Sequence, residues 1–135
     1  MTAPVGTAQT DIARFRTAVI PTNGDTTTLL KLLESQEVRR ALASKAFEVR
    51  LDLPSQFLEK ADLFGERTAN RLALALSQTS RLHSAWRIAS DAPDGGGQQE
   101  LESLVLAALE QIKEAETAIG EAFNALTADG RASFR

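Results

Sequence analysis

The chain has 135 residues, of which 43% are hydrophobic and 24% charged, and its formal net charge is −3. This size and composition predict one globular domain with a hydrophobic core, and the acidic balance is unfavourable for binding nucleic acid. The absence of cysteine excludes disulfides, thiolate metal sites and cysteine nucleophiles. Residues 1–20 lack the apolar core of a secretion signal, and no run approaches the roughly 18 apolar residues of a membrane span, so we expect a cytoplasmic protein.

The amino-acid composition favours helices over strands. The chain contains no tyrosine and one tryptophan, and leucine and alanine are more frequent than the β-branched residues that strands prefer. We therefore predict an all-α fold, an antiparallel bundle of three long helices plus a short N-terminal helix or arm. The bundle domain is expected at residues 11–128, between a flexible arm at 1–10 and a polar C-terminal tail at 129–135.

The first predicted element follows the N-terminal arm. Residues 11–19 place Ile12, Phe15 and Val19 on one face at steps of three and four. Because a helix this short is marginal on its own, the segment is expected to form either a short helix or an ordered arm with one helical turn. Residues 21–24, Pro-Thr-Asn-Gly, favour a turn.

Two long helical regions are expected next. An apolar stripe predicts a helix that begins at Asp25 or Thr26 and runs to about Leu51. A third helical region covers residues 54–89, in which Gly65 allows either a break or a continuous helix. We favour continuity, because no proline or asparagine reinforces a stop at this glycine.

The last helix is the strongest prediction. Residues 91–97 contain a proline and three glycines and form the connection. Residues 98–128 then carry a net charge of −5, against +3 for residues 66–90, so antiparallel pairing of the two segments sets opposite charges side by side. The apolar seam of this helix consists of Leu101, Val105, Ala108, Ile112, Ala115, Ile119, Ala122 and Leu126.

Further apolar residues widen this face. Leu104, Leu109 and Phe123 flank the seam, and Leu106 lies on the outer side. A two-stranded coiled coil needs only the narrow seam, whereas a helix in a bundle needs the wider face. These four residues are the predicted surface for a protein partner or for a second copy of the chain.

The single histidine, His83, is the one candidate for a reactive side chain. Its position beside core residues favours a polar residue at the edge of a helix pair. The alternative is a phosphoacceptor, because histidine phosphotransfer domains are four-helix proteins of this size with one histidine on a helix. Those domains usually have lysine and glycine three and four residues after the histidine, where this chain has Trp86 and Arg87.

The sequence gives little support for DNA binding, a metal site or catalysis. Residues 61–65 followed by Arg67 and Arg71 suggest a helix-turn-helix for DNA binding, but Arg71 stands where that motif needs an apolar residue. Di-iron sites in bundles need Glu-x-x-His pairs, and one histidine cannot supply two. No phosphate-binding loop or serine triad is present, so we expect no enzyme activity, metal, cofactor or small-molecule substrate.

The function expected from the sequence is therefore that of a non-catalytic helical interaction protein. An adaptor, a secretion-type chaperone or an assembly subunit would use the apolar helix faces to bind a partner or further copies of itself. Phosphotransfer through His83 and helix-turn-helix DNA binding are the alternatives.

Overall fold

The structure, a computed structural model, describes residues 2–20, 27–53, 65–93 and 97–133. Within these ranges the regular elements are all α-helices, which confirms the predicted all-α class. The helices are α1 (Thr2–Val19), α2 (Thr27–Leu32), α3 (Gln36–Glu48), α5 (Glu66–Asp91) and α6 (Gln98–Ser133).

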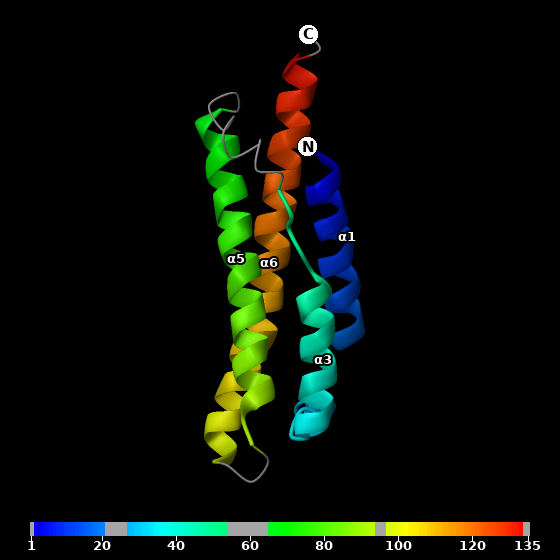
Figure 1. The fold of residues 1–135 in the computed structure, drawn as a ribbon, viewed down its shortest axis with the longest axis vertical. Helices are drawn as coiled ribbons and strands as arrows, with labels where there is room; N and C mark the ends of the chain where they lie inside the picture. The colour runs from blue at the N-terminus through cyan, green and yellow to red at the C-terminus, as the bar shows by residue number, and fades with distance from the viewer. Residues whose placement is uncertain (1, 21–26, 54–64, 94–96, 134–135) are drawn as a thin grey trace.

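The four longer helices lie side by side and alternate in direction (Figure 1). α6 packs against α5 along most of its length and against α1 on its other side, and α3 packs against α5. The contact between α1 and α3 is the smallest of these four. The antiparallel α5–α6 pair agrees with the prediction from the loop between them.

The core is centred on α6. Seven of the eight predicted seam residues are buried, from Val105 to Leu126, and Leu101 is half-buried against the core. α5 contributes Leu82 and Trp86, and the Trp86 ring meets Phe15 of α1 edge to face with ring centroids 5.6 Å apart. The repeat of four and three thus predicts the buried face of α6 correctly.

The N-terminal arm predicted at residues 1–10 is corrected, because α1 begins at Thr2. Val5 and Ala8 are fully buried and extend the spacing of Ile12, Phe15 and Val19 by one heptad. Residues 11–19, which were expected to form either a short helix or an arm with one helical turn, are the second half of this 18-residue helix.

Two predicted continuous helices are interrupted. The helix expected to end near Leu51 is split into α2 and α3, because the backbone at Ser35 is extended, with φ −82° and ψ 124°. Ser35 is the N-cap of α3, although its side chain forms no capping hydrogen bond. The prediction of a continuous helix across Gly65 is wrong, since Gly65 has ψ 153° and α5 begins at Glu66. Asp25, Thr26 and residues 54–64 lie outside the described residues.

The C-terminal end of α6 is later than predicted. The helix continues through Asp129 and Gly130 to Ser133, so residues 129–133 are not a separate tail. A glycine inside a helix costs about 1 kcal/mol relative to alanine, a penalty that a helix of 36 residues can accommodate.

Candidate protein-binding groove beside the start of α6

The groove arises because α1 is half as long as α6. The two helices have 18 and 36 residues. Their antiparallel register is marked by an ion pair between Arg16 Nε and Glu116 Oε2 at 2.8 Å, and by Gly6, which lies beside the ring of Phe123. α1 ends at Val19, three residues after Arg16, so the first turns of α6 extend beyond it.

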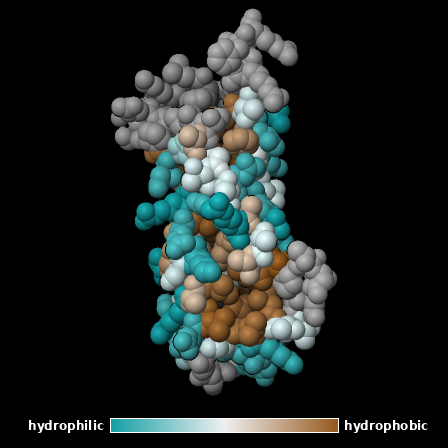
Figure 2. All heavy atoms as spheres, turned by 90° about the vertical axis from the view of Figure 1, so that its right-hand side faces the viewer, coloured by the Kyte–Doolittle hydropathy of each residue, from teal (hydrophilic) through white to brown (hydrophobic). Residues whose placement is uncertain are grey.

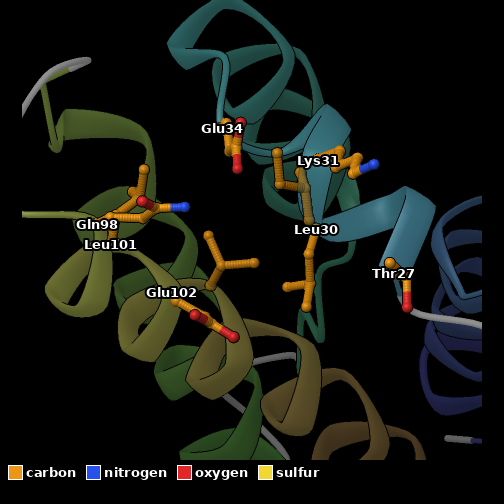
Figure 3. Close-up of a pocket in the computed structure, with 9 residues that line it drawn as sticks. Thr27, Leu30, Lys31, Glu34, Gln98, Leu101 and Glu102 are labelled. Atoms are coloured by element: carbon orange, nitrogen blue, oxygen red, sulfur yellow. The ribbon is translucent and has the colours of Figure 1, made fainter.

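α2 covers this part of α6 incompletely. Between the two helices lies a cavity of about 220 Å³, which we call the α2–α6 groove. Figure 3 shows Leu30 pointing from α2 towards α6, and Gln98, Leu101 and Glu102 coming from the first turns of α6. The residues that line the groove are Thr27, Leu30, Lys31, Leu33, Glu34, Gln98, Leu101, Glu102 and Val105.

The floor of the groove is apolar and its rim is polar. Leu33 and Val105 are buried at the floor, and Leu30 and Leu101 are half-buried against the core. The rim is charged or polar: Thr27, Lys31, Glu34, Gln98 and Glu102. Figure 2 shows hydrophobic side chains gathered in the lower half of the molecule, at the end where α6 begins. An apolar side chain fits this floor.

A buried arginine positions α2 beside the groove. The side chain of Arg39 is 0% exposed. It donates hydrogen bonds to the carbonyls of Leu33 and Glu34, both at 2.8 Å, and to the carbonyl of Ala89 at 2.7 Å. It also donates to the carbonyl of Ala92. Arg39 therefore joins the end of α2 to the C-terminal end of α5, where unpaired carbonyls need donors.

The structure does not bring the predicted partner-binding residues together. Leu109 is 6% exposed in the core, and Phe123 packs against the core beside Gly6 of α1. Leu104 is half-buried, and Leu106 is exposed to 45%. Residues two apart lie on nearly opposite sides of a helix, so Leu104 and Leu106 cannot share a surface. Leu106 stands one turn after Glu102 but is not among the residues that line the groove.

His83 connects α5 to the end of α3. Its Nε2 lies 2.7 Å from the carbonyl oxygen of Val49, and because a carbonyl only accepts, Nε2 carries the proton. The ring is half-buried and meets Phe47 edge to face at 5.7 Å, and the guanidinium of Arg87 covers the Phe47 ring. A phosphoryl group on Nε2 would displace this hydrogen bond. Phosphotransfer through His83 stays a prediction.

The arginines of the suggested helix-turn-helix lie on α5. Arg67 is exposed, and Arg71 Nη1 forms an ion pair with Glu121 Oε2 of α6 at 2.8 Å. This ion pair is an example of the predicted pairing of opposite charges between residues 66–90 and residues 98–128. Both partners are more than a third exposed, so the pair contributes at most about 1 kcal/mol. Residues 61–64 of the motif lie outside the described residues.

Neither a cluster of metal-binding side chains nor a membrane-spanning helix is found in the described part of the chain. No three histidine, aspartate or glutamate side chains there converge on a point that could hold a metal ion. None of the described helices combines the length and apolar character needed to cross a bilayer. Comparison with protein families, curated proteins and solved structures found no match to this chain.

Proposed function

We propose that this chain is a non-catalytic, cytoplasmic interaction protein, of the adaptor, chaperone or assembly-subunit kind, which binds a protein through the α2–α6 groove. The observation that carries the proposal is the apolar floor left between α2 and the first turns of α6, where α1 has already ended. The α2–α6 groove, as the described residues form it, is concave, with an apolar floor and a charged rim.

Energetic considerations support a protein partner. A buried aliphatic or aromatic side chain gains about 1.5–3 kcal/mol on leaving water, and such anchors supply most of the affinity in protein interfaces. The rim can orient the bound partner, because Lys31, Glu34 and Glu102 can form ion pairs or hydrogen bonds around the anchor. A nucleic acid is disfavoured, because two carboxylates at the rim and a net charge of −3 would repel phosphates.

The absence of cysteine makes a site-specific test straightforward. A photo-crosslinker attached to Gln98→Cys sits on the groove rim, and one attached to Ser77→Cys sits on an exposed part of α5. In lysate of the native host we expect a discrete protein adduct from the Gln98 position that excess unlabelled wild-type chain suppresses. No adduct there, or an equal adduct from Ser77, would argue against the groove as a binding site.

A further inference from the structure

We propose that the α2–α6 groove binds a basic segment of its protein partner, in which one apolar side chain fills the cavity and lysine or arginine residues lie on either side of it. The inference rests on the proposed function and names the chemistry of the partner. Three observations support it: the size of the cavity, the two carboxylates at its edges, and the charge of this end of the bundle.

The cavity has room for one large apolar side chain. Its volume is about 220 Å³, and an apolar cavity of about 150 Å³ already holds a group of the size of benzene. Leu30 and Leu33 come from α2 and the residue after it, and Leu101 and Val105 come from α6. A leucine or phenylalanine of the partner therefore finds apolar contacts on both sides of the groove.

Two carboxylates stand at the edges of the cavity. Figure 3 shows Glu34, just after α2, and Glu102 of α6 on opposite sides of it, whereas Lys31 extends away from it. Both glutamates are exposed, and within the described ranges neither carboxylate accepts a hydrogen bond or joins an ion pair. A lysine or arginine beside the partner's apolar residue can pair with each of them while its aliphatic stem packs along the rim.

The surroundings of the groove have the same negative sign. α2, the start of α3, the end of α5 and the start of α6 meet at one end of the bundle (Figure 1). In residues 27–38, 88–91 and 98–106 the exposed ionic side chains are one ammonium group and five carboxylates: Lys31 against Glu34, Glu37, Asp91, Glu100 and Glu102. This charge attracts a cationic segment and repels an anionic one. A wholly apolar segment would remove water from the rim carboxylates without replacing its hydrogen bonds.

The test is an NMR titration of the ¹⁵N-labelled full chain with three short capped peptides. The first has one leucine flanked on each side by two lysines, the second has glutamates in place of the lysines, and the third has alanine in place of the leucine. We expect the first peptide to shift the amide signals of Leu30, Leu101 and Val105 in a saturable way. Its dissociation constant should be about tenfold lower than that of either other peptide, because two ion pairs and the apolar anchor are combined only in the first.

Variants of the rim test the role of each charge. Glu34→Gln and Glu102→Gln should each weaken binding of the first peptide about threefold. Glu110→Gln is the matched control, because it removes the same charge from an exposed position about two turns further along α6 and should leave binding unchanged. Lys31→Gln should strengthen binding about twofold, since it removes the one cation of the lining, and misfolding cannot produce a gain.

Equal affinity for the lysine and glutamate peptides, equal effects of Glu102→Gln and Glu110→Gln, or signal shifts confined to residues outside the groove would overturn the proposal. If the lysine peptide does not bind while Gln98→Cys captures a protein, the basic partner is excluded and the proposed function stands. If the peptide does not bind and Gln98→Cys captures nothing, both fall.

Discussion

Arg39 joins the end of α2 to the C-terminal end of α5 by hydrogen bonds. Its guanidinium donates to carbonyls at the end of α2 and at the C-terminal end of α5. A guanidinium presents five N–H groups in a fixed planar arrangement, so no other side chain can serve all these carbonyls from one buried position. The shape of the groove therefore depends on a residue that does not line it.

Replacing Arg39 should be strongly destabilising. Arg39→Ala leaves several buried carbonyls without a donor, and we expect the free energy of unfolding to fall by about 3 kcal/mol or more. Urea denaturation followed by the fluorescence of Trp86, the single and fully buried tryptophan, measures this change. Arg40→Ala is the matched control, because Arg40 is exposed. A loss for Arg39→Ala no larger than for Arg40→Ala would mean that the carbonyls do not need this donor.

Trp86 carries a polar group that its surroundings leave unsatisfied. Within the described residues its buried indole N–H has no acceptor. Trp86→Phe removes this unpaired donor, worth about 1–3 kcal/mol, while it opens a small cavity. We therefore expect Trp86→Phe to cost less than Leu82→Ala, which only removes buried volume, in urea denaturation followed by circular dichroism. The opposite order would show that the packing lost with the indole outweighs the removal of its unpaired N–H.

At the scale of the element, the sequence predicts α6 well and α2 poorly. The seam of α6 repeats over its whole length, and burial follows that repeat. The stripe from Leu29 to Val49 also repeats, so it predicts one helix where the chain forms α2 and α3. The break at Ser35 is coupled to the hydrogen bonds of Arg39 to α5, which are long-range contacts that a local pattern does not contain.

The groove could not be predicted for the same reason. Its floor combines Leu30 and Leu33 with Leu101 and Val105, which are about 70 residues away in the chain. The sequence marks all four as apolar and predicts that the first helix ends at Val19, but it does not show against which turns of α6 that helix packs. Of the predicted partner-binding residues, Leu109 and Phe123 lie in or against the core, Leu104 is half-buried, and only Leu106 is exposed, although it does not line the groove.

Two glycines, one inside a helix and one at a helix N-cap, should respond differently to replacement by alanine. Gly120 lies inside α6, and a Cβ there would meet only Gln9 Nε2 at 3.9 Å. Gly120→Ala should therefore raise the free energy of unfolding by about 0.5–1 kcal/mol, from helix propensity. Gly65 is the N-cap of α5, a position at which alanine is much poorer than glycine, so Gly65→Ala should give no gain. Thermal unfolding of the two variants compares them directly, and equal shifts would contradict the assignment of Gly65 as a cap.

At the scale of the whole molecule, the length of α1 determines how much of α6 is covered. Its buried face pairs with the second half of α6, from Glu116 to Phe123, and leaves the first turns to α2. The same length difference thus leaves α1 packed against one half of α6 and the groove beside the other half. An arm at residues 1–10, as the sequence predicts, would leave Phe123 uncovered as well.

Shortening α1 tests whether residues 2–10 pack against α6 as a helix or form an arm. A chain that lacks residues 1–10 loses Val5 and Ala8 from the core and exposes Phe123, so we expect it to lose about 3 kcal/mol of stability or more in urea denaturation. Val5→Asp should have a similar effect, because it places a carboxylate in the core, whereas Thr7→Asp changes an exposed position of the same helix and should be nearly neutral. If Val5→Asp is as stable as Thr7→Asp, residues 2–10 do not pack against α6 in solution. The uncovered surface would then extend from the groove to Phe123, and the partner would be expected to bind along the full length of α6.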